Sequence, residues 1–462
     1  MENTSLSGRL FHRLQDPHLV ARFQQLCGVR GTFTSTAAGT ERNRGGDGAK
    51  RDRERALGNG ACPGDAPGDD GEAAAAGAGE PRRGASRGRH KAAKKRDEPA
   101  EEPGEDEEAL PRNGAATLGR EPAAGGAVKP LRKNSLTGDA GQEFIIENRF
   151  LYYLFTFGTE LGNELFYITF FPFVMWNVDA FVARRLIAVW VWVMYLGQCT
   201  KDLLGWARPA SPPVVKVEMF YNSEYSMPST HAMSGTAIPF ALFYMTHGRW
   251  EYPFAVGFSV ALSWCVLVCV SRIYMGMHSL LDVVAGVLYS SLILAVSLPA
   301  LDSLDVFVLH SRWAPLLVMA LPFVLALLCF RLDAWSTSRG DTAQILGTGA
   351  GVALASHVNL RLGFSRDPVA RSLAFPSPSA GLFVTAAVRL VAGVAVLVLT
   401  RAVMKAVTLT TLCRVLRLGG GGDVRRARQH MEVELPYRYI VYGTVGFNVL
   451  FLVPLLLSYA QL

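Results

Sequence analysis

Residues 253–300 read PFAVGFSVALSWCVLVCVSRIYMGMHSLLDVVAGVLYSSLILAVSLPA, which is two apolar runs joined by a short polar stretch. The runs cover about 253–272 and 279–300, close to the roughly 20 residues that an α-helix needs to cross a bilayer. Backbone polar groups find no water inside a bilayer, so runs of this kind are helical. The stretch therefore predicts a membrane protein built from helices.

Similar apolar runs lie on both sides of this pair. We expect further spans at about 150–176, 183–203, 231–247, 313–331, 342–359, 379–400 and 438–460. The stretch 402–417 is amphipathic and carries Lys405, Arg414 and Arg417, so we expect it to lie along the membrane interface. The predicted fold class is all-α, a polytopic bundle of about eight to ten transmembrane helices with no β-structure of note.

The N-terminal third of the chain has a different composition. Residues 1–30 place Leu and Phe at roughly helical spacing, which predicts a short amphipathic segment that Pro17 interrupts. Residues 31–143 are rich in Gly, Ala, Arg and Glu and bury too little apolar surface to offset the entropy of ordering, so we expect a disordered tail. The rest divides into a transmembrane core that carries the motifs described below, 144–300, and C-terminal transmembrane helices, 301–462.

The overall charge and the cysteines exclude two classes of protein. The formal net charge is +7, but basic and acidic residues alternate in the tail, as in Arg51–Arg55, which indicates a solvated polyampholyte. We therefore expect membrane lipids as partners and no nucleic acid. The seven cysteines include no Cys-x-x-Cys pair, so neither a disulfide framework nor a zinc site is predicted.

Three cations stand at the ends of predicted spans. Lys201 and Arg208 are seven residues apart, which is two helical turns, and Arg272 ends the run at 253–272. Any one of them could mark a membrane boundary, because basic residues gather there. Together they match the needs of a phosphoryl group, since an arginine fork holds two of its charged oxygens at once. They predict a phosphate-binding site at one face of the membrane.

Two histidines stand at the same boundary. His278 and Asp282 are four residues apart, which places both on one helix face and lets the carboxylate orient the ring as a nucleophile. A structural pair at a helix start is the alternative, but ionisable residues that begin a membrane span are usually functional. His231 follows Ser229 and Thr230 at another helix start, where either hydroxyl can cap the helix and the free N–H groups suit an anion. We predict His231 as a general acid.

Metal ions offer another route to phosphate chemistry. Glu218 and Glu224 are isolated in the loop after Arg208, and Asp202 is the only other acid close to the motifs. We find no carboxylate cluster there and expect the cations of the protein to do the work of a metal. Neither a metal ion nor another cofactor is predicted.

The side of the membrane that bears these residues follows from the basic loops. Arg184 and Arg185 stand at the start of the predicted span 183–203, beside the first short loop, and three further arginines lie in 361–371, which marks their shared side as cytosolic. The motif residues lie on the opposite side and are predicted to face the lumen. If the N-terminal tail is cytosolic and two spans precede Lys201, the motif residues would instead face the cytosol. A break in the first span near Gly158 and Gly162 would restore the luminal orientation.

Three blocks in this order resemble a known family. They are Lys-x6-Arg-Pro at 201–209, Pro-Ser-x-His at 228–231 and Ser-Arg-x5-His-x3-Asp at 271–282. The set resembles the type 2 phosphatidic acid phosphatase superfamily, which includes the lipid phosphate phosphatases. The resemblance implies a phosphohistidine intermediate on His278, oriented by Asp282, with His231 protonating the leaving group. It implies phosphate contacts from Lys201, Arg208, Ser229 and Arg272.

Thr230 replaces the glycine that is usual in the second block, where it adds a hydroxyl and removes backbone freedom, and we include it among the candidate phosphate-binding residues. Pro-Ser-Thr-His with Ser-Arg-Ile-Tyr-Met-Gly-Met-His resembles the sphingosine-1-phosphate phosphatase branch. The opening 14–29 and the Ala/Gly/Arg-rich tail resemble mammalian members of that branch. This implies an endoplasmic reticulum enzyme with a luminal site that acts on sphingoid base phosphates.

Two alternatives stay open on the sequence. The blocks address only phosphate, so phosphatidate, polyprenyl diphosphate or glucose-6-phosphate could be the substrate. A non-catalytic lipid-binding or transport protein could reuse the same scaffold. Such a relative would be expected to have lost His231, His278 or Asp282, and this chain has all three.

Overall fold

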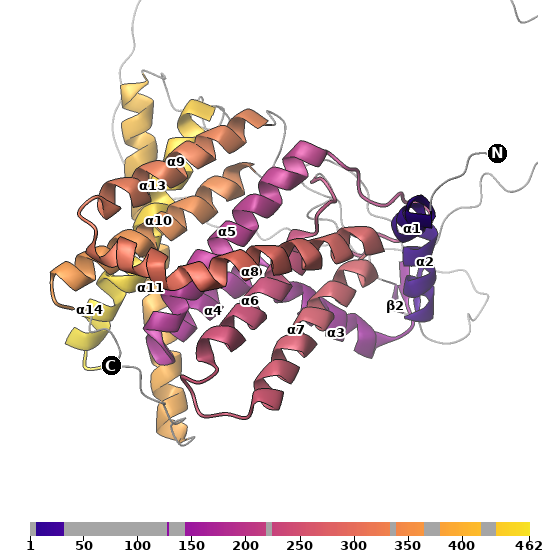
Figure 1. The fold of residues 1–462 in the computed structure, drawn as a ribbon, viewed down its shortest axis with the longest axis horizontal. Helices are drawn as coiled ribbons and strands as arrows, with labels where there is room; N and C mark the ends of the chain where they lie inside the picture. Colours follow the sequence, from indigo (N-terminus) through magenta and orange to yellow (C-terminus); the bar gives the residue numbers. More distant parts are fainter. Residues whose placement is uncertain are drawn as a thin grey trace, which may run out of the picture. The chain divides into compact units, whose positions relative to one another are not determined.

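The structure is a computed structural model that describes residues 6–31, 127–128, 144–218, 224–332, 339–364, 379–416 and 431–462. These residues form long α-helices and three short strands (Figure 1). The helices are α1 (Leu6–Gln15), α2 (Pro17–Leu26), α3 (Arg149–Glu160), α4 (Glu164–Asn177), α5 (Ala180–Leu204), α6 (Thr230–Thr246), α7 (Phe254–Tyr274), α8 (Leu280–His310), α9 (Ala314–Leu332), α10 (Arg339–Arg361), α11 (Ala380–Val415), α13 (Met431–Leu450) and α14 (Leu452–Tyr459).

The strands form one small antiparallel sheet in which β3 (Phe144–Ile146) lies between β1 (Val29–Gly31) and β2 (Ala127–Val128). Ile146 is opposite both Val29 and Ala127. The sheet joins the N-terminal segment to the start of the helical bundle. Most of the predicted tail, 31–143, lies outside the described residues.

The predicted all-α fold class is confirmed. Six described helices are long and apolar enough to cross a membrane: Ala180–Leu204, Phe254–Tyr274, Leu280–His310, Ala314–Arg331, Ala380–Val415 and Glu432–Tyr459. The other long helices, α6 and α10, carry more polar residues or fewer turns. The chain is a multi-pass membrane protein. The domain boundary expected at residue 300 falls within α8.

Helix α5 forms the middle of the apolar core. Its buried residues, such as Leu186 and Val193, belong to one cluster with residues of α4, α6, α8, α10 and α13. The helix contacts α4, α6, α8, α9 and α10. Because neighbours surround α5, the polar side chains at its C-terminal end are held among several helices.

Two predicted elements differ in the structure. The span expected at about 150–176 is two helices, because the chain turns at residues 161–163 between α3 and α4. The stretch 402–417, expected as a separate interfacial helix, continues α11 as far as Val415. No proline interrupts α11, and its two glycines lie before residue 400, so nothing ends the helix there.

The N-terminal segment is two helices that pack on the bundle. Asp16 caps α2 and Pro17 occupies its first turn, where proline is tolerated, so Pro17 begins a helix and does not simply break one. Gln24 of α2 is buried and donates to the carbonyls of Val215 (2.7 Å) and Tyr274 (2.8 Å). The backbone N–H of Val215 donates back to Gln24 Oε1 at 3.0 Å. This side chain ties the loop after α5 to the end of α7.

Candidate active site

Tight turns at helix ends bring the three sequence blocks together. Helix α5 ends at Leu204 because Gly205 adopts a left-handed φ of 61°, which redirects the chain toward Arg208. After α7, Gly276 has a φ of 71°, and a Cβ at this position would overlap the backbone oxygen of Val215. Only glycine fits both the angle and the space. The turn leads directly to His278.

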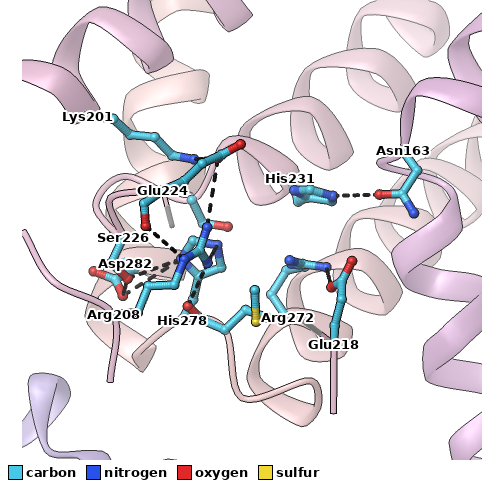
Figure 2. A network of polar contacts seen from close by, with 12 residues as sticks. Asn163, Lys201, Arg208, Glu218, Glu224, Ser226, His231, Arg272, His278 and Asp282 are labelled. Atoms are coloured by element: carbon cyan, nitrogen blue, oxygen red, sulfur yellow. Dashed lines mark hydrogen bonds and ion pairs between the residues drawn. The ribbon is translucent and has the colours of Figure 1, made fainter. Parts of the chain in front are cut away.

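Arg208 lies against the predicted nucleophile (Figure 2). Its guanidinium donates to the carbonyls of Glu224 (Nε, 3.0 Å) and Met277 (Nη1, 2.9 Å). Arg208 Nη1 also lies 3.3 Å from His278 Nε2. Arginine has only N–H donors, so in this contact Nε2 is the unprotonated nitrogen and the ring proton is on Nδ1. The lone pair of Nε2 therefore faces a cation.

The other two predicted cations lie nearby, each beside a carboxylate. Lys201 Nζ is 3.2 Å from Glu224 Oε2, and Arg208 Nη2 is 3.8 Å from the same oxygen. Arg272 Nη1 is 2.7 Å from Glu218 Oε2. Glu218 and Glu224, predicted to stand apart from other carboxylates, each form an ion pair with a cation of the site.

Two of the three guanidinium nitrogens of Arg272 make no hydrogen bond to the described residues. Its side chain is fully buried, and its Nε and Nη2 have no hydrogen-bond partner among the described residues. Buried N–H groups of a charged side chain are costly to leave unpaired. We use the name cation cluster for Lys201, Arg208 and Arg272. Its free donors indicate that it accommodates an additional anion.

Asp282 contacts His278 less directly than its spacing predicts. His278 precedes the N-cap Ser279, so the two residues do not share a helix face, and Asp282 Oδ2 lies 3.8 Å from His278 Nδ1. The carboxylate accepts the Ser279 backbone N–H at 2.7 Å, in a capping box. Ser226 donates to Asp282 Oδ2 at 2.6 Å, and its Oγ is 3.4 Å from His278 Nδ1. Ser226 thus lies between the carboxylate and the ring.

The surroundings of His278 keep its ring neutral. The residue is buried, and burial lowers the pKa of His278 well below its ordinary value. The positive charges of Arg208, Arg272 and Lys201 lower the pKa of His278 further. A neutral imidazole is the form that can attack an electrophile. Lys216, which donates to Gly276 O at 3.0 Å, adds a fourth cation in the same region.

The second block lies across from His278 at the start of α6. Ser229 is the N-cap of α6, accepting the Ala232 N–H at 3.4 Å, and its own N–H donates to Asp282 O at 3.1 Å. Thr230 is the first residue of the helix and is buried. The Nε2 of His231 lies 3.0 Å from Asn163 Oδ1, just before α4. Figure 2 shows the His231 ring turned toward Asn163, with Arg272 and Glu218 below it in this view.

Four of the eight predicted site residues line a cavity, whereas Ser229, Arg272, His278 and Asp282 are not among its lining residues. A space of about 270 Å³ is lined at one end by Lys201, Arg208, Thr230 and His231. Within the described part of the chain, no group of three or more His, Cys, Asp or Glu side chains is arranged to hold a metal ion. The cationic donors are thus the groups placed to meet an anionic ligand.

Known proteins resemble this chain over nearly its whole length. Residues 170–303 match the PAP2 superfamily. Rat sphingosine-1-phosphate phosphatase 1 is 49% identical over 97% of this chain and 96% of its own length. Human sphingosine-1-phosphate phosphatase 2 is 39% identical over 72% of this chain and 86% of its own length.

The chain belongs to the sphingosine-1-phosphate phosphatase family. More distantly, lipid phosphate phosphatase delta of Arabidopsis thaliana is 30% identical over 35% of this chain and 41% of its own length. No solved structure matches the chain. The PAP2 match spans residues 170–303, and every predicted site residue lies within it, either on a helix from α5 to α8 or in a segment that joins two of them.

Several residues of the site escaped prediction from the sequence. Ser226, Asn163, Glu218 and Glu224 contact the predicted residues but belong to no block. Ser226 lies two residues before Pro228, so its closeness to the second block was a usable signal. Asn163 comes from the turn before α4, 68 residues from His231, and no local pattern connects the two.

Proposed function

We propose that the chain is a metal-independent phosphatase that hydrolyses sphingosine-1-phosphate and related sphingoid base phosphates to the free base and phosphate. The observation that carries the proposal is the 3.3 Å contact of His278 Nε2 with Arg208 Nη1, beside a cation cluster in which two nitrogens of Arg272 have no partner among the described residues. The substrate class rests on relatives named for sphingosine-1-phosphate that match nearly the whole chain.

In the first half-reaction, His278 Nε2 attacks phosphorus and the bond from phosphorus to the sphingoid oxygen breaks. Lys201, Arg208 and Arg272 bind the phosphoryl oxygens, with Ser229 and Thr230 supplying hydroxyl donors, and so stabilise the charge of the transition state. His231 takes up a proton as the anionic substrate binds and gives that proton to the departing oxygen. The products are free sphingoid base and phosphohistidine.

In the second half-reaction, water attacks the phosphohistidine while His231, now neutral, accepts a proton from that water. The bond from phosphorus to His278 breaks and the imidazole is restored. Asp282, acting partly through Ser226, stabilises the ring proton on Nδ1 throughout. Both histidines return to their starting states.

We also propose that the protein resides in the endoplasmic reticulum membrane with this site on the luminal side. Arg184 lies near the start of α5 and Lys201 near its end, a rise of about 25 Å at 1.5 Å per residue. Loops rich in arginine face the cytosol, so the site end of α5 is assigned to the other side.

The proposal is tested by phosphate release from the purified full-length protein in detergent with EDTA present. Sphingosine-1-phosphate is compared with phosphatidate, and His278→Ala is assayed alongside. We expect preferential release from the sphingoid lipid that the substitution abolishes. Equal turnover of both lipids would overturn the narrow substrate class, and undiminished release by the variant would overturn the mechanism.

A further inference from the structure

The cavity at the active site continues into the bundle along one face of α5. The α5 residues that line it recur at spacings of three or four, which is one side of a helix. They are Lys201, Gln198, Met194, Trp190 and Ile187. From Lys201 to Ile187 the rise is about 21 Å. The opposite wall comes from α10, α11 and α13, through residues such as Ile345, Leu397 and Val445.

Along α5 the lining changes from polar to apolar with distance from the cation cluster, while the opposite wall also carries polar side chains, namely Asp341, Gln344, Thr348 and Arg401. Gln198 lies one helical turn from Lys201, is 5% exposed, and its Oε1 has no hydrogen-bond partner among the described residues. Beyond Gln198 the α5 wall is Met194, Trp190 and Ile187. A buried amide oxygen without a partner is costly, which indicates that a donor from a ligand meets it.

The α4 side of the cavity carries a carboxylate. Glu164 is the first residue of α4, lines the cavity, and has no ion-pair partner among the described residues. It follows Gly162, where a Cβ would be in contact with the His231 ring, and Asn163, whose Oδ1 lies 3.0 Å from His231 Nε2. Glu164 is therefore placed near the histidine that protonates the leaving oxygen.

We propose that Glu164 and Gln198 bind the polar head group of a single-chain amino-alcohol phosphate, and that the apolar part of the cavity binds its alkyl chain. This rests on the proposed function and specifies its substrate. In a sphingoid base phosphate, the ammonium is on the carbon next to the one bearing the ester oxygen, and the hydroxyl is on the next carbon. Glu164 meets the ammonium and Gln198 Oε1 accepts the hydroxyl.

Charge and size both favour this ligand. An ammonium beside the cation cluster is repelled unless a carboxylate opposes it. Three carboxylates line the cavity, and Glu224 pairs with Lys201 while Asp341 pairs with Arg438, which leaves Glu164 for the ammonium. The cavity volume of about 270 Å³ is slightly below the range of about 300–1,000 Å³ that is common for ligand sites. One alkyl chain suits this space better than the two chains of phosphatidate.

The test compares three phosphate esters in the full-length protein: sphingosine-1-phosphate, its N-acetyl derivative, and lysophosphatidate, which has one chain and no amine. Glu164→Gln is expected to lower kcat/KM for sphingosine-1-phosphate about tenfold, the usual weight of a hydrogen bond to a charged group. It should leave the other two substrates within about twofold, because neither carries a cation for the carboxylate to bind. Glu147→Gln, at an exposed pair with Arg30, is the matched control and should change none of them.

The outcomes separate this inference from the proposed function. If the wild-type protein releases phosphate from none of the esters, the proposed function fails. If it hydrolyses sphingosine-1-phosphate and Glu164→Gln lowers all three substrates equally or none, only the ammonium contact is overturned. Gln198→Leu should likewise lower kcat/KM for sphingosine-1-phosphate more than for an analogue without the hydroxyl, and equal losses would overturn its assignment.

The position of the chain is tested by filling the cavity. Met194→Trp places a larger side chain in the apolar part, two helical turns from Lys201. We expect kcat/KM for a sphingoid phosphate of natural chain length to fall about tenfold or more, while a short-chain analogue keeps near wild-type turnover. Retained short-chain activity also shows that the variant folds. Equal activity toward both lengths would place the chain elsewhere.

Discussion

The two ends of helix α5 each hold buried or half-buried arginines among carboxylates, yet they are arranged differently. At its start, Arg184 forms two parallel contacts of 2.8 Å with Asp305 in α8. Arg185 contacts Asp302 at 2.7 Å and Asp305 at 2.9 Å. We call these four residues the Arg184 cluster. Its forks engage both oxygens of Asp305, as in a structural ion pair.

The cation cluster at the other end is left incomplete. Lys201 and Arg208 share one oxygen of Glu224 at 3.2 and 3.8 Å, and two nitrogens of Arg272 have no partner among the described residues. Similar residue types thus serve two purposes at the two ends of one helix. Complete pairing stabilises the bundle, and incomplete pairing beside a neutral histidine leaves donors for a phosphoryl group.

The largest expected effect comes from the nucleophile, which the Arg184 cluster lacks. His278→Gln should lower phosphate release by about 10⁴-fold or more, because no other group forms the covalent intermediate. Steady-state turnover of sphingosine-1-phosphate measures it. The matched control is His247→Gln, an exposed histidine just after α6, which should stay near wild type. A loss of less than tenfold at His278 would remove it as the nucleophile.

An arginine-to-lysine substitution in the cluster at each end of α5 tests whether the two clusters have different roles. Arg272→Lys keeps the charge but removes the fork, so kcat/KM should fall about a hundredfold, as for loss of one transition-state donor. Arg184→Lys should lower the thermal unfolding midpoint in detergent while kcat/KM changes less than about twofold, because only structural contacts are lost. Equal kinetic losses at both positions would contradict the division between the ends.

The pH dependence of kcat/KM tests whether the cation cluster lowers the pKa of His278. Burial and then Arg208 lower the pKa of His278, so the neutral nucleophile persists until the pH falls well below the ordinary histidine value. Arg208→Gln removes one cause of that lowering, and the acid limb of its kcat/KM profile should move to higher pH. Ionisation of the substrate is the same for both proteins and does not account for a difference. An unchanged limb, or a shift to lower pH, would show that Arg208 does not act on His278.

The smallest effect is expected from the carboxylate that occupies the cation cluster. Glu224→Gln removes the charge that competes with phosphate for Lys201 and Arg208. Inorganic phosphate should then inhibit turnover a few-fold more strongly, since like charges no longer oppose each other. The inhibition constant for phosphate is the measurement. Weaker inhibition would mean that Glu224 helps to bind phosphate through Lys201 instead of competing with it.

The sequence predicted these regions unequally. Apolar runs predicted the helices, because span length and backbone satisfaction follow from local composition. The three blocks predicted residues that the structure does bring together. The contacts of Ser226 and Asn163 depend on loops that meet far apart in the sequence. Likewise, the Asp282 carboxylate turned out to cap its own helix, because His278 lies before the helix begins.

The central claim is that the cation cluster serves a phosphoryl transfer through His278. The most direct measurement is trapping of the intermediate with sphingosine-1-phosphate that carries radiolabelled phosphorus, quenched rapidly in alkali, where a phosphorus–nitrogen bond survives. Wild-type protein should retain label that acid removes, and His278→Gln should retain none. Label that persists in His278→Gln, or rapid turnover by the wild type with no trapped label at any time point, would contradict the claim.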